Sequence, residues 1–336
     1  MKEKTLTIII PCYNTSKLLP KALDSILKYP AQIEDLEVLV VNDGSKDSTL
    51  SVAQEYADRY PSIIRAIDKP NGGWGSVINH AIPLATGKYL RVLDSDDWLN
   101  EDEFPAYMEL LRSCNTDVVA TNCREIYADN NYKDFIFNNN QIDKTYSFDD
   151  FLKNNDYIHN LNLSIVTMKR SILDNSDYSI PERYYADIPF IMYPLRDVQT
   201  IYFSNLNIYR YWKGNEGQST SLIGYNSHLT DFINVVNNLV LFYEVNKASL
   251  SQARLTMYET DFSKLIDFCY YMLLAPTYSG GKKESKRILK NFDLFIKKNS
   301  NTLYNKSGKR KAKGKFPFIK VWRMTGINIL KLTKWI

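Results

Sequence analysis

Histidine and cysteine are scarce in this sequence, which has 336 residues but only three histidines and four cysteines. The cysteines stand far apart, without C-x-x-C or similar spacing, so neither a zinc site nor a disulfide framework is indicated. No two histidines have metal-ligand spacing either. We therefore expect reduced thiols and a protein of the cytoplasm.

Long apolar runs are missing as well. No run reaches the roughly 18–20 residues that span a bilayer, and the apolar stretch near the start is too short for a signal peptide. The sequence has no G-x-G-x-x-G after its first apolar run, no P-loop and no G-x-S-x-G. It thus gives no support for a dinucleotide oxidoreductase, a P-loop NTPase or a serine hydrolase.

Charge is distributed unevenly along the chain. Residues 280–336 contain 17 Lys or Arg and two acidic residues, whereas the remainder has a net charge of −11. Residues 318–335 predict a helix with basic and apolar sides, which suits an anionic membrane surface. The alternative is a helix packed on the protein's own core. We favour contact with the inner face of the cell membrane, and no nucleic-acid-binding motif accompanies the charge.

The first 120 residues alternate apolar runs with amphipathic segments, which predicts an α/β fold. The strands are apolar throughout, as in a mostly parallel sheet with helices on both faces. Later residues predict a helical region. The predicted strands are 5–10, 36–41, 63–67, 89–93 and 117–120, and the later helices are about 227–245, 250–274 and 283–298. We divide the chain into an α/β domain (1–225), a helical domain (226–304) and a basic linker with a terminal helix (305–336).

Polar, turn-rich clusters follow the predicted strands at residues 11–14, 42–45, 71–73 and 94–97. In parallel sheets, ligands bind beyond the carboxyl ends of the strands. Because all four clusters fall on that same edge, they predict the location of an active site.

The cluster Asp94-Ser95-Asp96 carries two carboxylates two residues apart. Hard oxygen ligands favour Mg²⁺ or Mn²⁺, and a metal there would neutralise a leaving diphosphate. An isolated motif of this kind is more often a solvated acidic turn. Its position after a buried strand, beside the other clusters, favours the metal.

Two other clusters have a similar ambiguity. Asp43 and Gly44 form either a plain turn or a site where Asp43 accepts the imide N–H of a uracil-like base and Gly44 permits close approach. Asn71 and Gly72 likewise form a generic chain break or a close backbone approach to a ligand.

In their order and spacing, these motifs closely resemble family 2 glycosyltransferases, inverting enzymes of the GT-A fold. The resemblance covers about the first hundred residues. The matching segments are residues 8–14, 41–49, 71–73, 79, 85–89 and 93–98. It implies a GT-A domain, Rossmann-like, that binds a nucleotide-sugar donor, with UDP as the expected nucleotide.

The resemblance also implies roles for individual residues. Asp94 would lie near the ribose or sugar, and Asp96 would bind Mg²⁺ or Mn²⁺ at the diphosphate. The family's catalytic base is usually the aspartate of a Glu-Asp pair at a helix start, which here corresponds to Asp187, with Ala186 in place of the glutamate. The alternative is that Asp187 is simply an acidic residue at a helix N-terminus, where the helix dipole favours it. The remaining donor-binding residues would be Pro11, Tyr13, Asn14, Asp43, Gly44, Asn71, Gly72, Asn79 and Ser95.

Acceptor contacts are expected from Asp97, Trp98 and Gln218. Trp98 would stack on an acceptor sugar, or else serve as a packing anchor. The sequence lacks the Q-x-x-R-W motif of processive synthases, so we expect transfer of one or a few sugars to a lipid-linked glycan or cell-envelope polysaccharide. Two alternatives are a sugar nucleotidyltransferase, which would need a glycine-rich loop after the first strand, and a non-catalytic nucleotide-sugar or glycan-binding protein.

Overall fold

The computed structural model describes residues 4–137, 142–154, 161–174, 178–182, 184–213, 221–275, 281–309 and 317–331. The chain divides into two compact units, residues 1–216 and 217–336. The first unit is an α/β structure, and the second is helical in its described part.

A ten-stranded sheet forms the centre of the first unit, within the residues described. The strand order is β3-β2-β1-β4-β9-β6-β10-β5, with β7 paired to β6 and β8 paired to β10. The strands are β1 (Lys4–Cys12), β2 (Leu36–Asp43), β3 (Ile64–Lys69), β4 (Gly87–Val92), β5 (Trp98–Leu99), β6 (Val118–Tyr127), β7 (Tyr132–Phe135), β8 (Lys144–Ser147), β9 (Val166–Lys169) and β10 (Thr200–Lys213).

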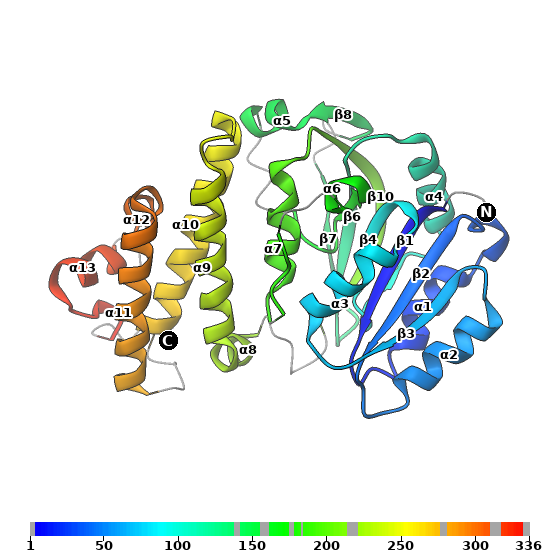
Figure 1. The fold of residues 1–336 in the computed structure, drawn as a ribbon, viewed down its shortest axis with the longest axis horizontal. Helices are drawn as coiled ribbons and strands as arrows, with labels where there is room; N and C mark the ends of the chain where they lie inside the picture. The colour runs from blue at the N-terminus through cyan, green and yellow to red at the C-terminus, as the bar shows by residue number, and fades with distance from the viewer. Residues whose placement is uncertain are drawn as a thin grey trace. The chain divides into compact units, whose positions relative to one another are not determined.

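Strands β3, β2, β1 and β4 are parallel neighbours, which confirms the predicted sheet. The central residues of β1, β2 and β4, such as Ile8 and Val40, are fully buried, because helices lie on both faces of the sheet (Figure 1). The fifth predicted strand, β6, does not adjoin β4. The antiparallel strand β9 lies between them, and its four residues are too few for periodicity to reveal.

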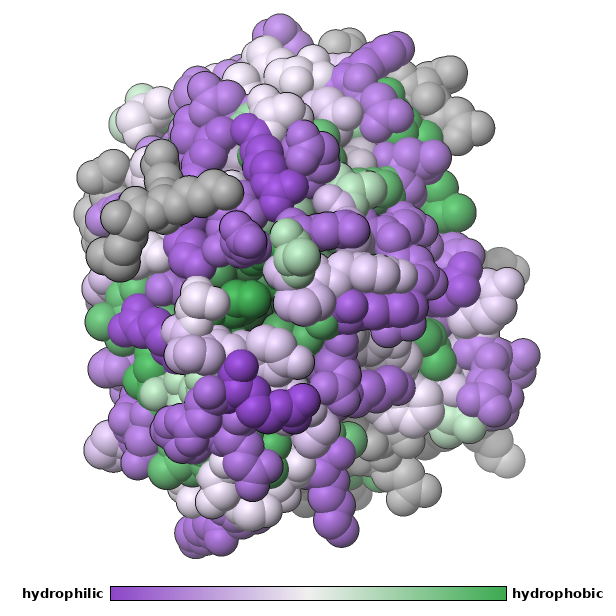
Figure 2. Space-filling view, turned by 90° about the vertical axis from the view of Figure 1, so that its right-hand side faces the viewer, coloured by the Kyte–Doolittle hydropathy of each residue, from purple (hydrophilic) through white to green (hydrophobic). Residues whose placement is uncertain are grey.

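Seven α-helices accompany the sheet in the described part of the first unit. Figure 2 shows that the face turned to the viewer is mainly hydrophilic, with hydrophobic residues confined to small patches. The helices are α1 (Leu19–Leu27), α2 (Thr49–Arg59), α3 (Trp74–Ala81), α4 (Phe104–Ser113), α5 (Phe148–Asn154), α6 (Arg170–Asp174) and α7 (Asp187–Met192).

One ion pair ties helix α4 to the start of the sheet. The Arg112 guanidinium donates from Nη2 to Oδ1 of Asp35 at 2.7 Å and from Nε to Oδ2 at 2.9 Å. Burial alone would raise the pKa of Asp35, but Arg112 and the Thr5 hydroxyl lower it to about 2. The carboxylate therefore stabilises the fold only while it is ionised.

We expect Asp35→Asn to lower the free energy of unfolding at pH 7 by about 1–3 kcal/mol, a range that allows for the partial exposure of Arg112. The pKa is about 2 when folded against an ordinary value of 3.8, so this stabilisation is present above pH 3.8 and lost as the pH falls toward 2. Urea denaturation of both proteins from pH 7 to pH 3 measures the difference. The exposed control Asp58→Asn should show no such trend, and a constant difference for Asp35→Asn would contradict the ion pair's role.

The second unit contains the three long helices that the sequence predicted, close to their predicted limits. Serine side chains begin three of its helices: Ser221 accepts from the backbone N–H of Gly224, Ser251 from that of Arg254, and Ser300 from that of Leu303. No helix among the described residues combines the length and apolarity of a bilayer span. The helices are α8 (Leu222–Ser227), α9 (Leu229–Asn246), α10 (Gln252–Leu274), α11 (Lys282–Asn299), α12 (Asn301–Lys306) and α13 (Phe318–Thr325).

The prediction of one continuous helix over residues 318–335 is wrong. Helix α13 ends at Thr325 because Gly326 adopts a left-handed conformation, with φ at +71°. Its apolar residues Phe318 and Ile319 are buried, so this part of the expected membrane-facing side packs inside the second unit.

Arg323, predicted on the exposed basic side of that helix, also points inward. Its guanidinium pairs with Asp293 at 3.0 Å and lies 3.8 Å from the ring centroid of Tyr304. It also donates to the hydroxyl of Tyr270 at 2.9 Å. These contacts attach α13 to α10, α11 and α12, which supports the alternative of a helix packed on the protein's own core.

Candidate active site

Two loops at the carboxyl edge of the sheet are joined through Asp43, the last residue of β2. Its Oδ1 accepts from Lys69 Nζ at 2.7 Å and from the Gly72 backbone at 3.0 Å, and its Oδ2 accepts from the Gly73 backbone at 2.7 Å. In return, the Asn71 amide donates to the backbone oxygen of Asp43. Asp43 therefore organises the edge, and its contact with a base stays a prediction.

Gly44 is required by this close approach. Its φ is +67°, and a Cβ there would lie 2.8 Å from the backbone nitrogen of Asn71. A side chain at this position would force the two loops apart. The close backbone approach expected at Gly44 is present in the structure, and it is an approach to Asn71 of the same chain. Its approach to a ligand stays a prediction.

Pro11 is buried within β1, and Tyr13, in the loop that follows the strand, is 48% exposed. Asn14 has a left-handed φ of +55°, and its side-chain oxygen accepts from the Lys46 backbone at 2.8 Å. Its own backbone N–H donates to the Ser45 hydroxyl. Asn14 thus couples the first two loops, while the open face of Tyr13 is available for stacking on a base.

The acidic hairpin, residues 94–97, is held by strand β10. The Tyr209 hydroxyl donates to Oδ2 of Asp97 at 2.7 Å and accepts from the Asp94 backbone N–H at 3.3 Å. The Trp212 backbone donates to the other Asp97 oxygen at 2.7 Å. Strand β5, directly after the hairpin, pairs with β10 and brings these groups into register.

These contacts give Asp97 a structural role. The residue is 2% exposed, and both of its carboxylate oxygens accept hydrogen bonds from β10. The buried carboxylate anchors the hairpin, and its contact with an acceptor stays a prediction. Ser95 is similarly buried, with its hydroxyl against the thiol of Cys12.

Trp98 also differs from its expected role. The Lys21 ammonium lies 3.0 Å from the centroid of its ring, and the Trp212 ring centroid is 6.2 Å away. One face of the indole is therefore covered by a cation. The packing alternative describes Trp98 better than stacking on a sugar, because that face is already occupied.

Asp94 faces a second set of partners. Its Oδ1 accepts from the Trp74 indole N–H at 3.0 Å. Burial, followed by the negative charges of Asp96 and Asp187, raises the pKa of Asp94 to about 7 against the opposing effect of Trp74. Asp187 is more than 90 positions away in the sequence, yet it lies close enough to act on this hairpin.

Asp187 begins helix α7 in an exposed position. Surrounding protein removes part of its hydration and raises its pKa, while the backbone N–H groups of Asp187 and Ile188 oppose this effect. Two residues earlier, Tyr185 is buried with a left-handed φ of +65°. Such a conformation is costly for an aromatic residue and often marks a functional site.

Helix α3 connects the acidic hairpin to the chain that leads into α7. The Trp74 ring packs edge-on against Phe190 of α7, at 5.7 Å between centroids. A Cβ on Gly75 would meet the backbone oxygen of Pro181 at 2.0 Å, so the two segments touch through their backbones. The Asn79 amide group bonds the backbone N–H and oxygen of Ile180, at 3.0 and 2.8 Å.

Through these contacts Asn79 docks the segment that contains Ile180, and its expected contact with a donor stays a prediction. Trp74, Lys69 and Tyr209 also bond to the predicted site residues, although the expected site residues did not include them. Lys69 could have been found only from the register of β2 and β3, in which it lies opposite Asp43. Gln218 lies outside the described residues.

The residues at the hairpin fit a divalent cation whose remaining ligands come from the substrate. Within the described residues, no three His, Cys, Asp or Glu side chains form a ready-made metal cage. Mg²⁺, however, is commonly held by one or two carboxylates together with substrate phosphates and water. Burial, together with the neighbouring negative charges, raises the pKa of Asp94, and a bound cation would favour its ionised form.

We expect Tyr209→Phe to destabilise the first unit by about 1–3 kcal/mol, because a buried carboxylate loses its hydroxyl donor. Urea denaturation followed by tryptophan fluorescence measures the loss. Tyr132→Phe is a matched control, since Tyr132 is 60% exposed and its change should stay within about 0.5 kcal/mol. Equal effects of the two substitutions would remove Tyr209 as the anchor of the hairpin.

Comparison with known proteins places this geometry in context. The family model described as "Glycosyl transferase family 2" matches residues 7–175. The matching curated proteins include an uncharacterized glycosyltransferase (MG025 homolog) of Mycoplasma pneumoniae, 46% identical over 100 residues, which are 29% of this chain and 33% of that protein. The minor teichoic acid biosynthesis protein GgaB of Bacillus subtilis is 35% identical over 108 residues, 31% of this chain and 12% of that protein.

Chondroitin synthase of Pasteurella multocida is 37% identical over 125 residues, 37% of this chain and 13% of that protein. The chain therefore spans a third or less of the length of these curated relatives. Among solved structures, S. aureus TarS 1–349 in complex with UDP-GlcNAc matches with a TM-score of 0.66 and 19% identity, over 90% of this chain and 84% of that one. This likeness confirms the expected GT-A fold.

Proposed function

This chain belongs to glycosyl transferase family 2, and we propose that it transfers a sugar from a nucleotide-sugar donor to a hydroxyl group of a glycan acceptor. The observation that supports the proposal is the position of Trp74, whose indole N–H donates to Asp94 and whose ring packs against Phe190 of the helix that Asp187 begins. The fold brings an exposed carboxylate from helix α7 to a second carboxylate at the end of β4. We take Asp187 as the proton acceptor and the end of β4 as the side on which the diphosphate would depart.

A UDP-sugar is the donor we propose. TarS, which has the same fold, is known in complexes with UDP-GlcNAc and with UDP. In this chain the exposed ring of Tyr13 offers a surface for the base. The loops that Asp43 and Asn14 hold together would then surround the nucleotide at the carboxyl edge of the sheet.

Asp96 and Asp94 are the residues that would hold Mg²⁺ or Mn²⁺. The bound cation would supply neutralisation of the charge that develops on the leaving diphosphate. The chain contributes the placement of the carboxylates: Trp74 orients Asp94, and Tyr209 fixes the backbone of the hairpin.

Asp187 is the proposed general base. Its carboxylate takes the proton of the acceptor hydroxyl as the acceptor oxygen forms a bond to the anomeric carbon. The bond from that carbon to the diphosphate oxygen breaks in the same step, and its electron pair leaves with the nucleoside diphosphate. A single displacement inverts the configuration at the anomeric carbon.

The acceptor class that we propose is a cell-envelope polysaccharide or a lipid-linked glycan. Two matching relatives are named for minor teichoic acid biosynthesis and for chondroitin synthesis, which supports a glycan acceptor. The C-terminal basic charge is compatible with work at the inner face of the cell membrane.

We expect Asp187→Asn to reduce transfer by about 10²–10⁴-fold, because an amide cannot accept the proton, and to leave UDP binding unchanged. Radiolabelled transfer and calorimetric UDP titration measure the two effects. Asp96→Ala should instead abolish the metal-dependent part of both. The exposed control Asp102→Asn should behave like the unmutated protein, and an Asp187→Asn protein with normal transfer rates would remove Asp187 from the mechanism.

A thermal-shift screen tests the donor class directly. A ligand that binds the native state stabilises it by mass action, so UDP with Mn²⁺ should raise the melting temperature more than either alone. Asp96→Ala should lose this synergy. Stabilisation by UDP-sugars with neither transfer nor slow donor hydrolysis would indicate a non-catalytic binding protein.

A further inference from the structure

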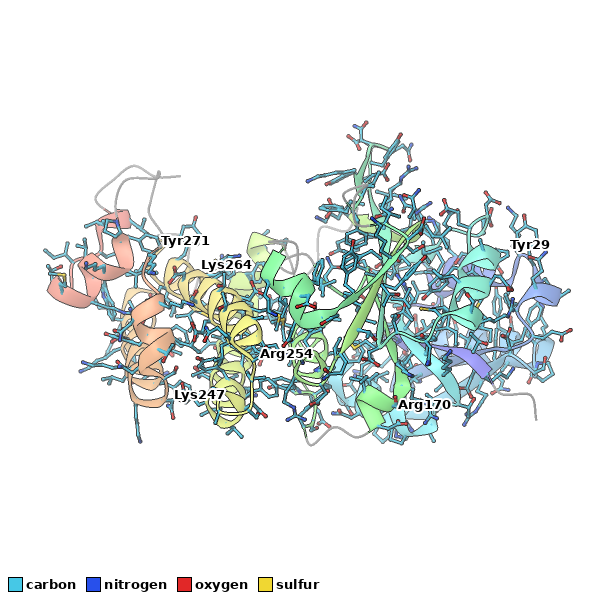
Figure 3. All side chains as sticks on the ribbon, turned by 90° about the horizontal axis from the view of Figure 1, so that it is seen from above. Tyr29, Arg170, Lys247, Arg254, Lys264 and Tyr271 are labelled. Atoms are coloured by element: carbon cyan, nitrogen blue, oxygen red, sulfur yellow. The ribbon has the colours of Figure 1, made fainter. Side chains whose placement is uncertain are left out.

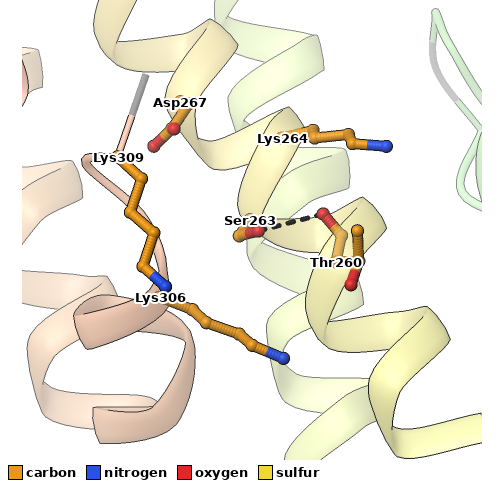
Figure 4. Close-up of a pocket in the computed structure, with 6 residues that line it drawn as sticks. All are labelled: Thr260, Ser263, Lys264, Asp267, Lys306 and Lys309. Carbon is orange, nitrogen blue, oxygen red and sulfur yellow. Dashed lines mark hydrogen bonds between the residues drawn. The ribbon is translucent and has the colours of Figure 1, made fainter. Parts of the chain in front are cut away.

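A cavity of about 650 Å³ lies in the second unit, between helix α10 and the chain that follows α12. Figure 3 shows Lys264 among the side chains of α10. In Figure 4, Lys306 extends from the neighbouring segment toward this helix and Lys309 extends toward Lys306, whereas the side chain of Lys264 points away from both. The residues that line the cavity are Thr260, Ser263, Lys264, Asp267, Lys306 and Lys309.

The local fold places these lysines on the cavity. Gly308 adopts a left-handed φ of +87°, which turns the chain between Lys306 and Lys309. The Gly308 backbone N–H donates to Oδ1 of Asp267 at 2.6 Å, and Asp267 is 7% exposed. The acidic residue of the cavity is thus engaged in fixing the turn.

Three lysines and one acidic residue are among the residues that line the cavity. Lys306 is oriented by an ion pair with Glu259, and Lys264 lies 3.7 Å from Asp261. Lys309 is exposed. The hydroxyls of Thr260 and Ser263 donate to helix carbonyls, so the ammonium groups are the donors that the wall offers to a ligand.

We propose that this cavity binds a phosphate group. Lysine ammonium groups bind phosphate as point charges, and the volume lies in the range of ligand sites, about 300–1,000 Å³, which leaves space for the group that carries the phosphate. The net charge of +15 over residues 280–336 attracts such an anion from a distance. The phosphate belongs either to a lipid headgroup or to a soluble phosphate.

This site is separate from the carboxylates of the first unit and does not depend on the proposed transfer reaction. A phosphate held here would retain a lipid or a phosphorylated glycan on the protein by contacts that the reaction itself does not use. Its loss should therefore leave UDP binding unchanged.

The test uses the full chain and the double variant Lys306→Ala/Lys309→Ala. Its matched control is Lys286→Ala/Lys290→Ala, which removes the same charge from exposed positions of α11. Binding of inorganic phosphate is measured by calorimetry, and binding to phosphatidylcholine vesicles with and without phosphatidylglycerol by cosedimentation. Because each lysine near an anionic surface contributes about fivefold in affinity, the double variant should bind about tenfold or more weakly, and the control should bind normally.

A second variant covers the case in which loss of Lys306 disturbs the fold through Glu259. Lys309→Glu reverses one exposed charge and should weaken binding in the same direction, with Lys290→Glu as its control. Loss of phosphate binding together with vesicle binding identifies a lipid headgroup. Loss of phosphate binding by a protein that never binds vesicles identifies a soluble phosphate. Equal binding by the cavity variants and their controls overturns the proposal.

Discussion

Burial of neighbouring carboxylates, reinforced by their mutual repulsion, is the constraint at the end of β4 on which the candidate site depends. Asp94, Asp96 and Asp97 lie within four positions, and the fold adds Asp187 to the same region. Such a concentration of negative charge costs free energy unless neighbouring groups offset it. The hydrogen bonds from Trp74, Tyr209 and the Trp212 backbone therefore hold in place an arrangement that the acidic side chains by themselves would open.

Much of the first unit could be predicted because its sheet leaves a strong signal. Strands β1, β2 and β4 are buried on both faces, so they appear as unbroken apolar runs, and the polar residues that follow them meet at one edge. The long helices of the second unit have clear limits for a similar reason. Asp187 was also recognisable, but only through resemblance to a family motif.

The parts that the sequence did not predict depend on contacts between distant segments. Nothing near Asp97 indicates that Tyr209 will bury it, and nothing near Asn79 indicates that its amide will bond Ile180. Asp and Asn often contact ligands, but here both side chains form hydrogen bonds within the protein. The helical pattern after Phe318 had the same limitation, because Gly326 ends α13 while the apolar periodicity continues.

The backbone contact at Gly75 has a consequence for how this protein can diverge. Since the glycine already touches the carbonyl of Pro181, the spacing between these two chain segments is set by main-chain atoms, which no exchange of residue type can shorten. Even a methyl group, the smallest possible side chain, would push helix α3 away from the segment that leads into α7. Changes in the surrounding surface must therefore arise at other positions, while the contact between Gly75 and Pro181 stays the same.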